Sequence, residues 1–584
     1  MNSPHSRLVR SATALVLASL VLSACGGGGG GGGSTPPPVS VTISGRITFD
    51  RIGFDATLGN GLNPTAPVES PARQVTVQAI DAGNSSVLAT ATTDTNGNYS
   101  VSVPSGRNLF IRARAEMVKS DATPTWNFSV RNNTTAGTND ALYALDGSPA
   151  SSGTADSTRN LRAATGFGTT SYTGTRAAAP FAILDTAYRA KELVLSAAPS
   201  TEFPELRMFW SDQNRPTANR FCPDTGDIGT TSYQVFGTND RDSCNQTNSD
   251  GIYILGDFAN GAGDTDEFDQ SVIAHEFGHY VEDKFGRSDS IGGQHGNDLP
   301  LDLRVAFGEG WGDAFSGMVL GNSVYRDSQQ GVTDDFSFDL EADADASDGA
   351  TEGWFSEFSV GEILWDLFDP ANEPGDTVAL GFTPIFTAIT SQMLKDTDAL
   401  TSIFTFADAL RAGTPSAAAG LDDLLAGENI HGTDDFGAGE SNAGGATGIL
   451  PIYKTIMLNQ PISVCSRSPF GDDTTNKLGN RVFIRFDNDT SRAVAIQVDG
   501  APAPMDPTTT FATDPDVFVL RRGGLVQFGA STPAGNAPHS TPGHETISQF
   551  VLAAGTVIIE VYDFEMSLVT NPQPRCMTVQ ITGN

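Results

Sequence analysis

Apolar and polar residues alternate in short runs between residues 39 and 119. The runs include VSVTISGRITF, RQVTVQAIDA and NLFIRARAE, and turn signals such as Asn96-Gly97 separate them. An alternation with a period of two places apolar side chains on one face of a β-strand, and Asn-Gly favours a tight turn between antiparallel strands. The pattern therefore predicts a small β-sandwich over residues 39–119.

The middle of the chain changes from this alternation to helical spacing. Residues 120–178 are rich in Thr, Ser, Asn and Gly, which predicts an irregular linker. In the next segment, APFAILDTAYRAKELVLSA, the residues Phe181, Leu184 and Tyr188 recur on one face of a helix. The strand-like runs ELRMFW, SYQVFG and GIYILGDFA follow, and then further helical segments. The middle of the chain therefore predicts a region of mixed helices and strands.

The alternation returns after GILPIYKTIMLNQP, in runs such as NRVFIRFDN, RAVAIQVDG and QFVLAAGTVIIEVYDF. It predicts a second β-sandwich over residues 451–584. With 584 residues, the chain is also too long for one ordinary domain. We therefore expect a multidomain α+β protein.

The N-terminal segment is typical of an export signal. Arg7 and Arg10 precede ATALVLASLVL, an apolar run that is too short to span a bilayer. The run ends in LSAC, which resembles the lipobox of bacterial lipoproteins. This resemblance implies that residues 1–25 are a signal with Cys25 acylated, and that residues 26–38 form a flexible Gly/Pro tether.

The residue after Cys25 is Gly26 rather than aspartate, which favours the outer membrane of a bacterial cell envelope. The lipid would then attach the protein to the membrane, with the rest of the chain periplasmic or surface-exposed. An ordinary signal peptide with an incidental cysteine is the alternative.

The composition is strongly acidic, with 34 Lys and Arg against 69 Asp and Glu and a formal net charge of −35. Such a chain would repel a phosphate backbone, so the charge argues against a nucleic-acid partner. It fits a soluble exported protein but identifies no partner.

Four cysteines remain besides Cys25, and they are Cys222, Cys244, Cys465 and Cys576. An even number in an exported chain predicts two disulfides. Three pairings are open, and pairing between neighbours in the sequence is the simplest. Four unpaired buried thiols are the alternative, which an oxidising compartment disfavours.

Two of the seven histidines lie four positions apart in SVIAHEFGHYVEDKFG, which also has an apolar helical face. On a helix, His275 and His279 would share one side, and neutral imidazoles are good zinc ligands. Glu276 would lie beside them, where its carboxylate can accept a proton from water. Two core histidines with ordinary hydrogen bonds are the alternative.

A second segment, VAFGEGWGDAFSGMV, has Glu309 and Asp313 four positions apart in a small and apolar setting. A zinc hydrolase usually has three protein ligands, so a third ligand is expected beyond the two histidines. A carboxylate in an apolar setting is buried only if it meets a cation. The glycines of this segment are poor helix formers, and we expect them to let this helix pack closely against the first.

The order H-E-x-x-H and then E-x-x-x-D resembles the gluzincin metalloproteases, and GEGWGDAFSG is similar to the GEGWSD segment of the fungalysins. The resemblance implies a zinc metalloendopeptidase that hydrolyses proteins or peptides, with a thermolysin-like domain of mixed sheet and helical lobe over residues 179–450. It places GIYILGDFA at the sheet edge that pairs with an extended substrate. By matched position, it implies three zinc ligands, one general base and one carboxylate that orients a zinc-bound histidine. The zinc ligands would be His275, His279 and Glu309. The general base would be Glu276, and the orienting carboxylate would be Asp313.

Two further resemblances concern the flanking modules. TATTDTNGNYSVSVPSG is similar to the carboxypeptidase-regulatory-like modules of surface proteins, and FVLAAGTVIIEVYD resembles the prepeptidase C-terminal modules of secreted bacterial proteases. Such modules are usually spacers or adhesive units, so a second hypothesis stays open. In it, the protein is a surface binding or adhesive lipoprotein on a degenerate metalloprotease scaffold.

One position departs from the fungalysin pattern. WFSEFSVGEILWD has Phe358 where that family has a histidine that hydrogen-bonds the tetrahedral intermediate. The departure favours the second hypothesis, whereas the intact ligand set favours an enzyme. An enzyme would need another donor, and the candidates are His295, His431, Tyr325 and Arg304. We rank His295 first because it lies in the segment that joins the two expected zinc helices.

Two acidic segments, residues 261–269 and residues 334–353, raise the question of calcium, which takes six to eight oxygen ligands. Neither has the residue order of an EF-hand loop. A solvated acidic loop is therefore the preferred interpretation of each, with Ca²⁺ as the alternative.

Overall fold

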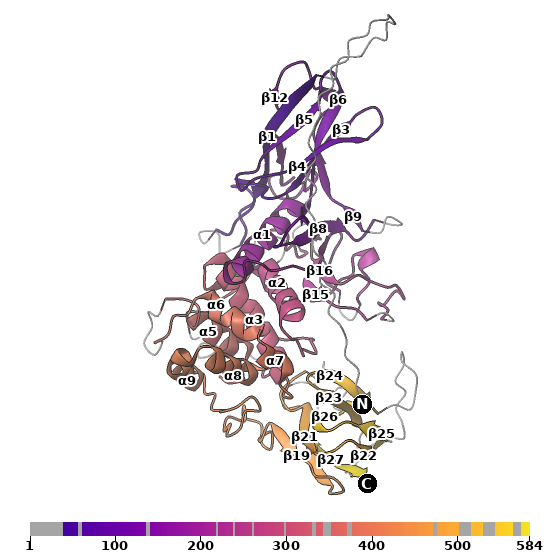
Figure 1. The fold of residues 1–584 in the computed structure, drawn as a ribbon, viewed down its shortest axis with the longest axis vertical. Coiled ribbons are helices and arrows are strands. Elements are labelled where there is room, and N and C mark those ends of the chain that lie inside the picture. The colour runs from indigo at the N-terminus through magenta and orange to yellow at the C-terminus, as the bar shows by residue number, and fades with distance from the viewer. Residues whose placement is uncertain are drawn as a thin grey trace, which may run out of the picture.

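The computed structural model describes the chain from residue 39 onward, with gaps. The described residues are 39–55, 61–135, 140–217, 220–237, 240–259, 262–296, 299–329, 334–342, 352–370, 377–470, 476–500, 515–529, 543–564 and 574–584. The expected signal, with Cys25, and the tether therefore lie outside the described residues. Figure 1 shows β-sheets at both ends of the long axis and helices between them, which makes the protein a multidomain α+β structure.

The N-terminal sandwich has two five-stranded sheets whose buried residues belong to one core. Alternation builds it as expected, because Tyr99, Val101 and Val103 of β5 are buried while the serines between them are exposed. In one sheet β1 pairs with every other strand, and the second sheet has the order β10-β6-β3-β4 with β11 on β6. The strands of the first sheet are β1 (Ser40–Arg51), β2 (Val68–Pro71), β5 (Asn98–Pro104), β12 (Ser157–Thr158) and β13 (Leu161–Ala163). Those of the second are β3 (Thr76–Asp81), β4 (Val87–Thr92), β6 (Asn108–Arg114), β10 (Ala144–Asp146) and β11 (Ala150–Ser151).

The segment 120–178 is not the irregular linker that its composition suggests, and the boundary at residue 119 does not separate two modules. Four of its strands, β10 to β13, belong to the N-terminal sandwich, where they pair with β1 or β6. These strands have only two or three residues each. A strand this short shows no period in the sequence, and it forms here because a longer strand distant in the chain supplies its hydrogen bonds.

A mixed six-stranded sheet forms the centre of the molecule, in the order β15-β16-β14-β8-β7 with β9 on β8. β8, β14 and β16 are parallel, and antiparallel strands flank them on both sides. The strand in GIYILGDFA is β16, and it lies inside the sheet rather than at the expected edge, because β15 pairs with it. The strands are β7 (Glu116–Lys119), β8 (Trp126–Asn132), β9 (Ala141–Leu142), β14 (Leu206–Trp210), β15 (Ser232–Gln234) and β16 (Gly251–Ile254).

The helices gather beside this sheet and in the lobe that follows it in the chain (Figure 1). They are α1 (Ala179–Ala197), α2 (Gln270–Phe285), α3 (Leu303–Leu320), α5 (Glu357–Asp366), α6 (Phe382–Ile389), α7 (Gln392–Asp396), α8 (Ile403–Gly413) and α9 (Ala418–Gly427). A two-stranded hairpin of β17 (Val324–Gln329) and β18 (Asp334–Asp339) lies between α3 and α5 in sequence. Over the described residues, no helix has the length and apolar character needed to cross a membrane.

The glycines of α3 let two other helices approach its backbone. A Cβ on Gly312 would lie 2.6 Å from the ring of His275 on α2. A Cβ on Gly310 would lie 2.5 Å from the carbonyl oxygen of Glu357 on α5. Real Cβ contacts are not this short, so both packings require glycine. Close packing against α2 was expected from the sequence, whereas the packing against α5 was not.

The C-terminal sandwich has one sheet in the order β19-β21-β26-β23-β24 and another in the order β20-β27-β22-β25. Buried residues of both sheets, such as Val494 and Ile559, form one core. The strands of the first sheet are β19 (Tyr453–Thr455), β21 (Arg481–Asn488), β23 (Pro515–Arg521), β24 (Gly524–Phe528) and β26 (Gly555–Asp563). Those of the second are β20 (Ile462–Ser466), β22 (Arg492–Gly500), β25 (His544–Leu552) and β27 (Arg575–Gly583).

Both expected disulfides are present, and each joins neighbours in the sequence. Cys465 and Cys576 are directly opposite each other on β20 and β27, and they are bonded. Cys222 and Cys244 are bonded in the loops around the central sheet. The predicted pairing is therefore confirmed.

Buried ion pairs join each sandwich to a helix of the central region. Arg51 and Arg73 of the N-terminal module both contact Asp185 on α1, which is 5% exposed. Arg304, at the start of α3, donates to Glu560 of β26 at 2.8 Å. Since Arg304 also pairs with Asp302, its guanidinium is used in a structural network and not as the donor considered above.

The close contact between α3 and α5 predicts the effect of Gly310→Ala. The added methyl must displace the α5 backbone, so we expect a loss of about 1–3 kcal/mol in the free energy of unfolding. Gly427→Ala is the control, because it adds a methyl to α9 with no atom within 4 Å. Urea unfolding followed by tryptophan fluorescence measures both variants. Equal midpoints for Gly310→Ala and the unmodified protein would contradict the contact.

Candidate metal centre

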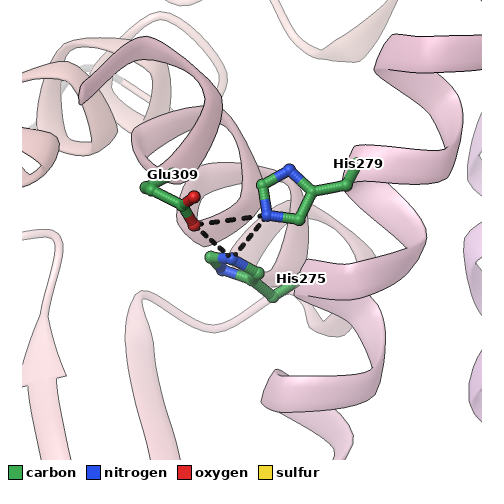
Figure 2. Close-up of side chains that lie close together, drawn as sticks. All are labelled: His275, His279 and Glu309. Carbon is green, nitrogen blue, oxygen red and sulfur yellow. Dashed lines mark hydrogen bonds and ion pairs between the residues drawn. The ribbon is translucent and has the colours of Figure 1, made fainter. Parts of the chain in front are cut away.

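Two adjacent helices bring three potential metal ligands to one point. His275 and His279 lie one turn apart on α2, and Glu309 faces them from α3 (Figure 2). Their ligand atoms are separated by 3.0 Å between the two histidine Nε2 atoms, and by 3.2 and 3.3 Å from these to the Glu309 Oε2. This group could hold a metal ion.

The electrostatics of the cluster favour a positive charge between these side chains. Burial disfavours a charged His275 ring, but the carboxylates of Asp313 and Glu309 outweigh this effect and raise its pKa to about 9. Burial likewise opposes the charge on His279, yet Glu309 and Glu282 raise its pKa well above the usual value. The cluster therefore provides a setting that stabilises a cation.

The outer nitrogen of each histidine faces a carboxylate. His275 Nδ1 lies 2.9 Å from Asp313 Oδ1, on the turn of α3 that follows Glu309. This contact holds Nε2 toward the cluster, which is the orienting role implied for Asp313. Glu282, which is 1% exposed, lies 4.0 Å from His279 Nδ1 on the same helix. Glu282 is not among the residues expected at the site, although its spacing of three from His279 was a visible signal.

Glu276 lies against the edge of the central sheet. It is 7% exposed, and its Oε2 accepts a hydrogen bond of 2.5 Å from the backbone N–H of Tyr233 on β15. Burial raises the pKa of this carboxyl, and the positive charge on His279 and His275 partly offsets the rise. The edge strand β15 is therefore the sheet element that touches Glu276.

His295 reaches the cluster from the loop between α2 and α3. Its Nε2 lies 3.5 Å from Glu309 Oε2, and its Nδ1 lies 3.0 Å from Oε2 of Glu357 at the start of α5. Partial burial disfavours a charged ring, but Glu309 and Glu357 outweigh it and raise the pKa of His295 to about 10. The side chain keeps 39% of its surface exposed, so it borders solvent as well as the candidate ligands.

The other donor candidates differ in their surroundings. The Tyr325 ring lies beside the cluster, with its centroid 6.0 Å from that of His275. His431 is exposed and contacts Asn429 and Glu440 instead. Phe358 is fully buried, with its ring 4.5 Å from that of Phe338. The position that departs from the fungalysin pattern is therefore a core position.

A second group of acidic side chains lies just before α2. Asp264 and Asp266 meet Asp327 of β17, with ligand atoms within 4.8 Å of one another, so this group could also hold a metal ion. Asp266 is only 3% exposed, which disagrees with the solvated loop preferred for residues 261–269. Residues 334–339 form β18, and 343–351 lie outside the described residues. Calcium, the alternative for both segments, stays untested.

Comparisons with known proteins do not establish a family. No family model matches the chain, and the search of curated proteins found no match. Similar solved structures include the pre-peptidase C-terminal domain of a collagenase from Bacillus anthracis, at 10% identity and a TM-score of 0.15 over 22% of this chain and 93% of that one. Another is CorA, a surface-associated copper-binding protein of Methylomicrobium album BG8, at 9% identity and a TM-score of 0.17 over 23% of this chain and 98% of that one. A third is the lysozyme inhibitor PliG of Aeromonas hydrophila, at 11% identity and a TM-score of 0.14 over 22% of this chain and 95% of that one. Likenesses at this level carry no argument about function.

The contact between Asp313 and His275 predicts that Asp313→Ala weakens metal retention by about 10–100-fold, as the loss of an orienting carboxylate does. Retention is measured by competition with a chelating dye, and circular dichroism checks the fold. Asp313→Asn keeps an acceptor oxygen at the same place and should lose less. Wild-type retention in Asp313→Ala would show that this carboxylate does not orient His275.

Proposed function

We propose that the protein is a zinc metalloendopeptidase with a thermolysin-like catalytic region, held on a bacterial outer membrane by a lipid at Cys25. The observation that carries the proposal is the meeting of His275, His279 and Glu309 beside the buried Glu276. The gluzincin pattern of the sequence supports the same assignment.

The donor set and its dimensions fit zinc. Two imidazoles and one carboxylate form a common ligand set of zinc hydrolases. With bonds of 2.0–2.1 Å in tetrahedral geometry, ligand atoms lie about 3.3 Å apart, close to the 3.0–3.3 Å between these atoms. A bound zinc would supply a Lewis acid that polarises a carbonyl and lowers the pKa of water.

Glu276 is the general base in this proposal. Its carboxylate lies in the turn between the two histidine ligands and is largely removed from solvent. It accepts the proton of the attacking water and later donates it to the leaving amine. The hydrogen bond from Tyr233 fixes one carboxylate oxygen, which leaves the other for the water.

His295 supplies the donor that Phe358 cannot. Glu357 contacts the Nδ1 of His295, and the Nε2 of His295 faces Glu309. An N–H in this place would stabilise the oxyanion of the tetrahedral intermediate. Glu357 is adjacent to the inward-facing Phe358, so α5 would still support a histidine donor although it no longer carries one.

Unfolded proteins or peptides are the proposed substrates. The strand β15 is the described edge of the central sheet next to Glu276, and an extended peptide can add to such an edge by backbone hydrogen bonds. A peptide bound in this way would lie beside the proposed general base. This pairing does not define a preferred side chain.

A binding or adhesive lipoprotein is the second candidate, and the buried Phe358 is the observation that favours it. Both candidates allow a bound metal, so metal content does not separate them. Turnover does, since only the enzyme hydrolyses an unfolded protein substrate in a chelator-sensitive manner.

The role of Glu276 predicts that Glu276→Gln keeps zinc but hydrolyses casein or a similar unfolded substrate at least 10²–10⁴-fold more slowly, roughly the effect of removing a general base. Elemental analysis gives the zinc content, with about one zinc per chain expected in both proteins. Removing zinc with a chelator should abolish turnover in the unmodified protein, and adding zinc should restore it. Unchanged turnover in Glu276→Gln would rule out this base.

The role of His295 predicts that His295→Ala lowers kcat by about 10²–10³-fold, which is the usual cost of losing one oxyanion donor. Zinc content should stay the same, because the proposed ligands are untouched. His431→Ala is the matched control, since this exposed histidine lies elsewhere and should not alter kcat. Loss of zinc from His295→Ala would make His295 a ligand rather than a donor.

A further inference from the structure

The loop that carries His295 has little structure of its own. Over the described residues between α2 and α3, it contains no helix or named strand. Gly292 and Gly293 have φ of 58° and 102°, a left-handed conformation that glycine adopts without strain. Such a segment needs outside contacts to hold one side chain in a fixed place.

The first half of the loop is held by the helical lobe. The backbone N–H of Asp289 donates to Thr401 Oγ1 at 3.1 Å, and the N–H of Thr401 donates to Asp289 Oδ2 at 2.9 Å. Arg287 adds hydrogen bonds to the carbonyl oxygens of Thr397 and Ala399. These contacts end several residues before His295.

The second half is held by the C-terminal module, through the segment between β20 and β21. The side-chain amide of Asn476 donates to the carbonyl oxygens of Gly292 at 2.9 Å and Gln294 at 3.1 Å. The carbonyl oxygen of Asn476 accepts from the N–H of Asp302 at 2.8 Å. One residue therefore joins the stretch just before His295 to the residue just before α3, which carries Glu309.

Neighbouring residues of the same segment add further hydrogen bonds to the loop. Lys477 Nζ also donates to the carbonyl oxygen of Gln294, and the N–H of Leu478 donates to the carbonyl oxygen of Pro300 at 2.9 Å. Asn476 is fully buried, and Lys477 is 5% exposed. Water therefore does not compete for these hydrogen bonds, which makes them effective constraints on the loop.

We infer that Asn476 is a positioning residue for His295, so that the C-terminal β-sandwich is part of the active site rather than a spacer. The inference rests on the proposed function, because it concerns the placement of the proposed oxyanion donor. The hydrogen bonds of Asn476 described above go to the loop backbone and to Asp302, and none of these partners is a proposed metal ligand. Asn476 acts by holding the backbone on which the imidazole is mounted, together with Glu357 at the ring itself.

The test uses the full-length zinc-loaded protein with Asn476→Ala, and Asn476→Asp as a variant of the same shape that lacks the donor amide. Both should raise amide hydrogen exchange in the peptide containing residues 290–296 by about tenfold. They should lower kcat by about 10–100-fold, because a small displacement of a catalytic group has such an effect. Zinc content should not change.

Asn488→Ala is the matched control. Asn488 is also a buried asparagine of the C-terminal module, 3% exposed, whose amide donates to two carbonyl oxygens at 3.0 Å, but both belong to the sandwich itself. It should leave exchange in the 290–296 peptide unchanged. In the His295→Ala background, Asn476→Ala should add less than about a threefold loss in kcat, since coupled residues are not additive.

Two results would overturn the inference. One is unchanged exchange of the 290–296 peptide in both Asn476 variants. The other is a loss of kcat that is equally large with and without His295, because Asn476 would then act through something else. If the unmodified protein shows no turnover, the proposed function fails, and the exchange measurement alone decides whether Asn476 orders the loop.

Discussion

The contact between α2 and α3 at Gly312 is the constraint on which the candidate site depends. The His275 ring occupies the space that a side chain at Gly312 would fill. Only in this position can its two nitrogens reach Asp313 and Glu309, which lie one turn apart on the same helix. A larger residue at Gly312 would separate the helices and with them the candidate ligands, so the metal-compatible geometry depends on the absence of one Cβ.

Charge explains why this packing favours a cation. Carboxylates outnumber imidazoles around the cluster, and all of the carboxylates are at least nine-tenths buried. They belong to Glu276, Glu282, Glu309, Asp313 and Glu357. Burial penalises uncompensated negative charge, so the group is stable when protons or a metal ion balance it. The neighbouring carboxylates raise the pKa of His275, His279 and His295, because a proton on each of these rings offsets part of the negative charge.

The two sandwiches are tied to the central region by the same kind of interaction but with different consequences. At the N-terminal side, Asp185 of α1, a helix that carries none of the candidate ligands, meets Arg51 and Arg73. At the C-terminal side, Glu560 meets Arg304. Arg304 lies on α3, less than two turns before Glu309. The C-terminal contacts thus bear on the helix and the loop that together form one wall of the site.

The sequence by itself determined the elements with strong local periods and the candidate ligands with helical spacing. The β5 alternation, the α2 pair His275 and His279, and the α3 pair Glu309 and Asp313 were all visible, because each depends on residues two to four positions apart. The disulfide pairs were also predictable, since neighbours in sequence were the simplest choice. Only the tertiary structure decided the rest. It joined the short strands of residues 144–163 to β1 and β6, placed β15 rather than β16 at the sheet edge, and brought Glu357 and Asn476 to the loop of His295. The contacts of Glu357 and Asn476 connect residues 62 and 182 positions apart, and no local pattern records a partner at that distance.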